Sequence, residues 1–556
     1  MRAPILTECT IAAAGKALLR DLDHATRQVE NSQKTVLRSI LSEASDTAFG
    51  KQHRISDRMS ISEYRSSVNI QSHEDLETSV LRIRQGAADI LFPGKPLRYI
   101  VAGPPVAYRW FPVSRRYYTA AIRHYNTLWL YSALRDNKSL LSGMWLTTCI
   151  PSVQITTGSP PCGSLGSTIF DAVPAALRRR HAVPLPIFTI EHSYARNYGI
   201  MRYALRNDIS WIISPDANLL LRLHRSVLDN RDDILRDIHD GTLRTDIAAE
   251  LDPHIRFSLV SRLRPDPSRA KILASVFATH DNRLQPKHYW PNIICISSWM
   301  RGKRAGATGQ FMELYPKSAA LREFGYQTSE ARAGMVLGNN RADSIPLINK
   351  FFFEFIEVEK RYSTIPEIRL AHELEAGKSY YILVTNGSGL FRYDTNDIIR
   401  VTSFYNRCPQ FEYVKRGELI THILDERLSE DQVARAVRQA AVETGLTPGY
   451  LKLFCDYPQK RYRLYAEIPE TTPPHQKQHF ILSFDAHLKF FNRIYAAGRA
   501  TNGIFAPNLI ELQPGSGRML SELRIEEEPR PEKPMNTGYL HHDGSMMHII
   551  DKHTKR

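Results

Sequence analysis

A change of sequence pattern near residues 416–428 limits the folds that are open to this chain. Before it, residues 350–415 carry aromatic and β-branched stretches separated by short turns, which is typical of several strands. After it, Ser429 opens a capping box and a helical pattern, and two alternating segments follow. We therefore expect a large domain over residues 1–422 and a smaller α/β domain over residues 423–556. A length of 556 residues allows about two to four domains.

Several individual elements follow from residue spacing. Apolar residues recur at helical intervals over Val29–Ala44, which predicts the first helix. A second helix is expected from Ser214, as the N-cap before a proline, to Gly241, with a break near Asn230. The stretch Ser379–Thr385 is aromatic and β-branched, which predicts a strand. Helices and strands are thus mixed along the chain.

The composition excludes several classes of protein. Apolar residues make up 42% of the chain, which is enough to bury a large core and excludes a disordered protein. No apolar run approaches the ~18 residues needed to span a bilayer, and Lys16 interrupts the short apolar stretch near the N-terminus. Six scattered cysteines without a CxxC pair favour neither a zinc knuckle nor a disulfide framework. We expect a soluble, cytoplasmic monomer that does not bind membranes.

The net charge of +15 would attract polyanions, whether nucleic acid, anionic lipid or nucleotide phosphates. Charge alone does not choose among them. A nucleic-acid binder is disfavoured, because the chain lacks the interleaved aromatic and basic residues of single-strand readers.

Three stretches carry a resemblance to a known family. Residues 326–330 read YQTSE, residues 353–356 read FEFI, and residues 389–401 read GLFRYDTNDIIRV. In this order and spacing they resemble motifs of the Gretchen Hagen auxin-responsive family of acyl-acid amido synthetases, part of the acyl-adenylate-forming superfamily. The agreement extends over about residues 25–450 and weakens over the last hundred.

The resemblance implies both a fold and a reaction. The fold would be a large N-terminal α/β domain that holds the nucleotide and the acyl acid, with a small mobile C-terminal α/β lid. In the reaction, a carboxylate would attack the α-phosphate of ATP to give acyl-AMP and pyrophosphate. An amine or amino acid would then displace AMP and form an amide.

The same resemblance implies a nucleotide site. Asp397 aligns with an aspartate that accepts hydrogen bonds from the ribose hydroxyls. Tyr326 would stack on the adenine, and Thr328 and Ser329 would donate to the α-phosphate. Glu330 offers the hard oxygen ligand that Mg²⁺ prefers. Taken singly, these residues are equally consistent with a buried tyrosine, a solvated glutamate and a turn aspartate.

Four further residues are assigned by position. Arg427 stands where the family often has a lysine, in the hinge loop before the lid helix, and would act on the phosphates when the lid closes. A surface arginine paired with an acidic neighbour is an equal alternative. Lys533 corresponds loosely to a late C-terminal lysine of the family. Gly103 remains from the phosphate loop, and Arg109 would replace that loop's lysine.

The phosphate loop departs from the family pattern. Residues 101–106 read VAGPPV, so the usual hydroxyl groups are missing and two prolines remove backbone N–H donors. Asp394 also replaces an arginine, and Asn396 replaces a glycine, an exchange that asparagine tolerates in a left-handed conformation. The alternative hypothesis is therefore a non-catalytic or repurposed member that binds an acyl ligand, a nucleotide or a partner.

Overall fold

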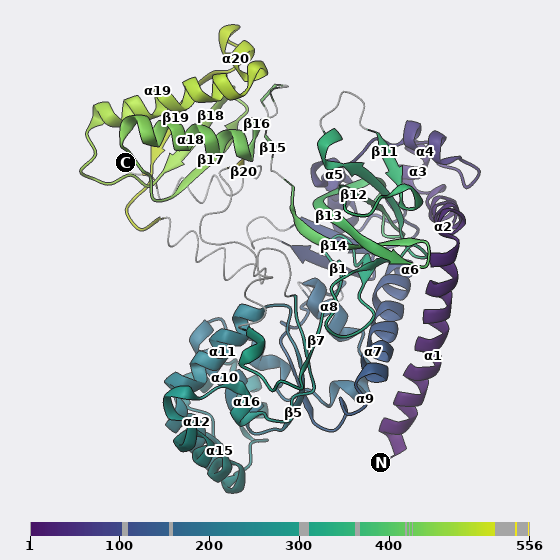
Figure 1. Cartoon of the computed structure of the whole chain (residues 1–556), viewed down its shortest axis with the longest axis vertical. Helices are drawn as coiled ribbons and strands as arrows, with labels where there is room; N and C mark the ends of the chain where they lie inside the picture. The colour runs from purple at the N-terminus through teal and green to yellow at the C-terminus, as the bar shows by residue number, and fades with distance from the viewer. Residues whose placement is uncertain are drawn as a thin grey trace. The chain divides into compact units, whose positions relative to one another are not determined.

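The computed structural model shows a chain divided into two compact units, Met1–Val101 with Trp110–Lys415, and Ala102–Arg109 with Arg416–Arg556 (Figure 1). The residues that it describes are 2–102, 109–154, 159–299, 311–361, 367–417, 420–421, 423–424, 426, 428–516, 540–541 and 554.

A four-stranded parallel sheet forms one part of the first unit. Its strands, in spatial order, are β3 (Met144–Thr147), β5 (Ile209–Ile213), β6 (Cys295–Ser297) and β7 (Ala320–Arg322). Because such a sheet is usually covered on both faces, its strands are mostly apolar, with the buried Arg322 of β7 as an exception. The helices gathered beside it in Figure 1 include α10 (Ser193–Leu205), α11 (Ala217–Asp229), α12 (Arg231–Asp240) and α15 (Pro267–His280). One apolar cluster joins this sheet to these helices.

A second, five-stranded sheet lies in the same unit. Its order is β11 (Ile368–Leu370), β10 (Phe352–Glu357), β12 (Ser379–Thr385), β13 (Tyr393–Tyr405) and β14 (Cys408–Arg416). β12 pairs antiparallel with both β10 and β13. This sheet therefore contains two of the three stretches that carry the family resemblance.

A buried ion pair joins those two stretches. Arg392 donates from Nε to Glu354 Oε2 at 3.0 Å, and both side chains are almost fully buried. Arg65, from α4 (Ile61–Ser67), donates to the other carboxylate oxygen at 2.8 Å. Charges at such depth persist only when they are paired and hydrogen-bonded. This ion pair thus gives the two stretches a structural role.

The second unit has its own sheet and core. The sheet order is β19 (Phe505–Glu511), β18 (Arg461–Ala466), β17 (Leu451–Asp456) and β20 (Leu540–His541). The helices α18 (Glu430–Thr444) and α19 (Pro474–Phe491) pack against each other, and α20 (Arg493–Ala500) follows. Their apolar residues form one cluster with those of the strands. A mixed α/β chain with a smaller C-terminal part is therefore confirmed.

Most of the local predictions match the structure. The helix predicted over Val29–Ala44 is α2, although α1 (Arg2–Arg27), which was not predicted, precedes it. The helical pattern is interrupted at Asn230 between α11 and α12, and Gly241 ends α12 with a φ of +69°. Ser429 forms the expected capping box of α18. Of the described helices, none combines the length and apolar character needed to cross a bilayer.

The predicted start of the second helix at Ser214 is wrong. The N-cap of α11 is Asp216, whose side chain accepts a hydrogen bond from the Asn218 backbone N–H at 2.8 Å. The Ser214 hydroxyl instead accepts a bond from Thr148 at 2.8 Å. The Ser214 hydroxyl, which local spacing assigned to the helix N-cap, is therefore bound by a residue 66 positions away.

Candidate active site

The YQTSE stretch folds back on itself between β7 and β8 (Gly334–Met335). The Gly334 N–H donates to the Tyr326 carbonyl oxygen at 2.8 Å, and the Thr328 N–H donates to that of Ala331 at 2.9 Å. The Thr328 hydroxyl accepts from the Ala331 N–H at 3.0 Å. The turn is thus closed by its own backbone, and the Thr328 hydroxyl forms part of it.

Tyr326 connects this turn to Asp397 on β13. Its hydroxyl donates to Asp397 Oδ2 at 3.0 Å and lies 3.2 Å from Thr395 Oγ1. Burial raises the pKa of Tyr326 well above its usual value, and the neighbouring Asp397 and Glu330 add to the rise. The phenol therefore stays protonated as a donor. Two stretches that are 71 residues apart meet at this hydrogen bond.

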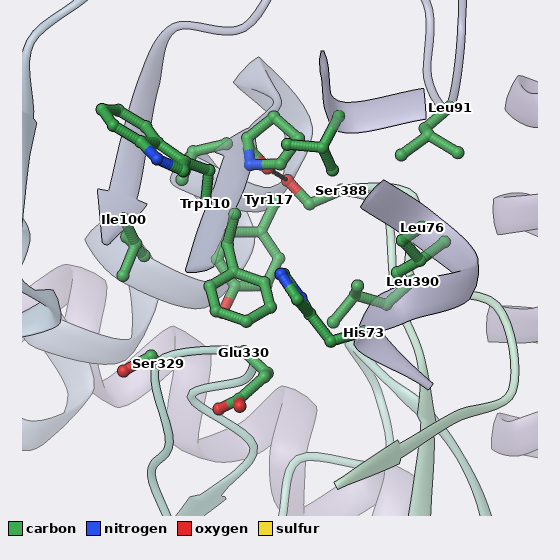
Figure 2. A pocket seen from close by; sticks show the side chains of 14 residues that line it. His73, Leu76, Leu91, Ile100, Trp110, Tyr117, Ser329, Glu330, Ser388 and Leu390 are labelled. Carbon is green, nitrogen blue, oxygen red and sulfur yellow. Dashed lines mark hydrogen bonds between the residues drawn. The ribbon is translucent and has the colours of Figure 1, made fainter. Parts of the chain in front are cut away.

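Ser329 and Glu330 line a pocket in the first unit. Figure 2 shows them on one side, with Tyr117, Trp110 and His73 also facing the pocket. Apolar side chains make up most of the remaining wall: Leu76, Val80, Leu91, Ile100, Phe111, Pro112, Val113 and Leu390, with Ser388. Glu330 is 4% exposed. An acidic group at the edge of a largely apolar pocket can hold a cation that arrives with a ligand.

The donor set suits Mg²⁺ more than a cation held by protein alone. Within the described ranges, no three His, Cys, Asp or Glu side chains are grouped as a metal centre. Mg²⁺ usually takes one or two carboxylates and fills its shell with water and substrate phosphates. A single buried carboxylate such as Glu330 fits that pattern.

The Asp394 substitution is compensated locally. Asp394 forms an ion pair with Arg361, and its other carboxylate oxygen accepts from the Asn396 N–H at 2.8 Å. Asn396 has a φ of +56°, as its replacement of a glycine predicts. Arg361 thus places a positive charge beside Asp394, the position where the family pattern has an arginine.

The other predicted site residues are only partly described. Arg109 is the first residue of β2 (Arg109–Val113) and is partly exposed. Gly103, Arg427 and Lys533 lie outside the described residues, and so does most of the altered phosphate loop. The roles given to these four residues stay predictions.

The sequence analysis did not select Arg332 as a candidate site residue. It follows Glu330 by two positions and is buried, and burial lowers the pKa of its guanidinium to about 10. No motif or spacing distinguishes it from the many surface arginines of a basic chain. Only its depth in the structure reveals it.

Comparisons with known proteins agree with the motifs. Residues 18–320 match the model of the GH3 family N-terminal domain, and residues 344–416 match that of the GH3 family central domain. The chain is 25% identical over 499 residues to indole-3-acetic acid-amido synthetase GH3.3 of Arabidopsis thaliana, covering 83% of this chain and 80% of that protein. It is 22% identical over 564 residues to GH3.5 of the same plant, covering 93% and 90%.

A solved structure shows the same fold. It is described as GH3.15 acyl acid amido synthetase and is 18% identical in sequence. The two superpose with a TM-score of 0.64 over 97% of this chain and 96% of that chain.

Proposed function

This chain belongs to the GH3 family, and we therefore propose that it is an ATP-dependent acyl-acid amido synthetase. The resemblance drawn from the motifs is confirmed at the level of the family. Relatives named as amido synthetases align with most of the chain. The proposed reaction activates a carboxylic acid as acyl-AMP with release of pyrophosphate, and then transfers the acyl group to an amine or amino acid.

The hydrogen bond between Tyr326 and Asp397 is the observation that carries this proposal. It brings the two nucleotide motifs together inside one unit, beside the turn that carries Glu330. In the proposed site, Asp397 accepts hydrogen bonds from the ribose hydroxyls. Tyr326 borders the adenine and holds the aspartate in place.

We assign the phosphates and Mg²⁺ to the turn and its surroundings. Glu330 would hold the Mg²⁺, which would neutralise charge on the phosphates. Ser329 and Thr328 would orient the nucleotide, and the phosphate roles proposed for Arg109 and Gly103 rest on their positions in the sequence alone.

Residues 423–556 are proposed to act as a lid. From it, Arg427 and Lys533 would meet the charge that develops as pyrophosphate leaves. The acyl acid and the amine are small-molecule substrates in this proposal, and the enzyme is a monomer.

Carboxylate-dependent exchange of labelled pyrophosphate into ATP tests the first step. The full-length protein is assayed across a panel of aliphatic and aromatic acids, with and without Mg²⁺. Asp397→Asn should reduce exchange at least tenfold through a weaker affinity for ATP. Asp394→Asn is the matched control three positions away, and it should retain exchange within about threefold, because its carboxylate pairs with Arg361. Absence of exchange with every acid, from folded wild-type protein, would overturn the proposal.

A non-catalytic binding role is the second candidate, favoured by the two prolines in the phosphate loop. Calorimetric titration with Mg-ATP separates the two functions. Micromolar binding with turnover eliminates the second candidate, whereas binding without turnover of any acid supports it.

A further inference from the structure

Arg332 is a buried cation that has no carboxylate partner among the described residues. Its side chain is 1% exposed, and no acidic side chain in the described part of the chain forms an ion pair with it. Nε donates to Gln327 Oε1 at 3.0 Å, and Nη1 donates to Asn126 Oδ1. These partners are neutral amides. Removing a guanidinium from water without a compensating charge is costly, so this arrangement needs an explanation.

Two other buried arginines of the same unit have carboxylate partners. Arg322 is 0% exposed and pairs with Asp136 at 3.0 Å. Arg392 pairs with Glu354 at 3.0 Å. Arg332 differs from both in lacking a carboxylate partner among the described residues. Arg202 shares that lack, but it lies among α10 and α12 and bonds carbonyl oxygens, whereas Arg332 is two residues from Glu330 in the site proposed for a polyanion.

The guanidinium of Arg332 is fixed against a neighbouring helix. Its Cζ atom lies 3.5 Å from the ring centroid of Tyr125, on α7 (His124–Asp136), in a cation–π contact. Nη1 also reaches the carbonyl oxygen of Ile122 at 3.5 Å. Ile122 belongs to η2 (Tyr118–Arg123), a π-helical stretch. Such stretches are rare in proteins, and those that occur often lie at functional sites.

The same residue holds the turn that carries Glu330. Gln327, its Nε partner, is the second residue of the YQTSE stretch and also donates to the Tyr125 hydroxyl at 3.0 Å. The Arg332 backbone N–H donates to the Tyr117 hydroxyl at 3.1 Å. Tyr117 lines the pocket together with Glu330, as Figure 2 shows. Arg332 thus fixes the turn on both sides of Glu330.

The two charges act on one phenol. Burial raises the pKa of Tyr117 to about 12, while Arg332 opposes this rise and Glu330 adds to it. Both charged groups therefore lie within electrostatic reach of Tyr117. A positive charge at this depth is screened less by solvent than one at the surface.

We propose that Arg332 is a positioning residue for the Mg²⁺–nucleotide site, whose planar fork clamps the 327–332 turn so that Glu330 faces the pocket. This inference rests on the proposed function, in which Glu330 holds the Mg²⁺. The fork geometry matters, because Gln327 and Asn126 are bound through different nitrogens of one rigid plane. The polyphosphate would supply the negative charge that the folded chain lacks around Arg332.

The test compares Arg332→Lys and Arg332→Met in the full chain. Binding of a non-hydrolysable ATP analogue is measured by calorimetry, with and without Mg²⁺. Both variants should lose about tenfold of the Mg²⁺-dependent gain in affinity, the size of one lost charge-assisted hydrogen bond. Affinity without Mg²⁺ should change less than threefold in Arg332→Lys, which keeps the positive charge. Wild-type behaviour of Arg332→Lys would overturn the clamp, because lysine keeps the charge but not the fork.

Arg202→Met is the matched control for loss of a buried arginine. Arg202 is 0% exposed and donates to the carbonyl oxygens of Thr242 and Asp237, among helices α10 and α12. It should lower stability but leave the Mg²⁺ dependence of binding as in wild type. An equal loss in Arg202→Met would mean that destabilisation alone explains the effect, and would overturn the inference.

Two more variants keep the outcome decisive. Asn126→Ala removes one acceptor and keeps the guanidinium, and should give about a threefold loss in the same direction if Arg332→Met fails to fold. Glu330→Gln tests the proposed function itself. If Glu330→Gln abolishes the Mg²⁺ gain and the Arg332 variants keep it, only the clamp is wrong. If Glu330→Gln keeps the gain, or wild type binds no nucleotide, the proposed site is wrong as well.

Discussion

Acidification should destabilise the first unit through His181. The imidazole packs against the rings of Phe170 and Trp145, with centroids 4.6 Å and 5.9 Å away. Neither ring nitrogen has a hydrogen-bond partner in the described structure. Burial, with a smaller contribution from Arg178, lowers the pKa of His181 from 6.5 to about 4. The folded protein therefore holds this imidazole neutral at a pH where an unfolded chain would protonate it.

The sign and size follow from linkage. Below pH 6.5 the unfolded state binds a proton that the folded state does not bind until about pH 4, so stability falls as the pH is lowered through that window. The full difference amounts to about 3 kcal/mol, at about 1.4 kcal/mol for each pH unit of pKa difference.

Urea unfolding of wild type and His181→Phe, followed between pH 7 and pH 4, measures this effect. Phenylalanine keeps an aromatic ring in the site and cannot take a proton. The variant should therefore become more stable than wild type on acidification, by up to about 3 kcal/mol relative to their difference at pH 7. The exposed His254 serves as control, and His254→Gln should follow the wild-type profile. A difference between wild type and His181→Phe that stays constant with pH would refute the reasoning.

Three further substitutions test the fold, each by its free energy of unfolding. Gly241→Ala should cost about 2–4 kcal/mol, since φ is +69° and an added Cβ would lie 2.3 Å from the Pro265 nitrogen; a neutral result contradicts this geometry. Glu354→Gln should cost about 3–5 kcal/mol because it leaves Arg392 buried without a counter-ion, and a loss below about 1 kcal/mol would show that the pair contributes little. Asn396→Gly should stay within about 1 kcal/mol of wild type at a φ of +56°, so a larger loss would mean that the asparagine side chain is needed there.

The sequence predicts elements whose signals are local. α18 begins where the capping box indicates, because the Ser429 side chain and the Gln432 backbone that form it are three residues apart. The predicted start of α11 was wrong because the Ser214 hydroxyl accepts a hydrogen bond from Thr148, which lies on a segment that local spacing does not identify. Short-range hydrogen bonds can thus be predicted from the sequence, whereas long-range ones cannot.

The same distinction applies to the candidate site. Tyr326, Glu330 and Asp397 could be selected because a motif order carries them, and the structure brings Tyr326 and Asp397 into contact. Arg332 could not be selected, since what sets it apart is burial among neutral partners, one of which, Asn126, lies on α7. The compensation of Asp394 by Arg361 was equally hidden, because the two residues are 33 positions apart.

The Glu354–Arg392 pair changes what a signature match can mean. Both residues lie in the stretches by which a homologue would be identified, yet they contact each other in the protein interior and do not line the pocket. Selection for a stable protein would keep these letters even in a descendant that had abandoned its chemistry. A genome search with the FEFI and GLFRY strings therefore identifies proteins with this fold. Active enzymes should instead be identified by the residues that border the ligand.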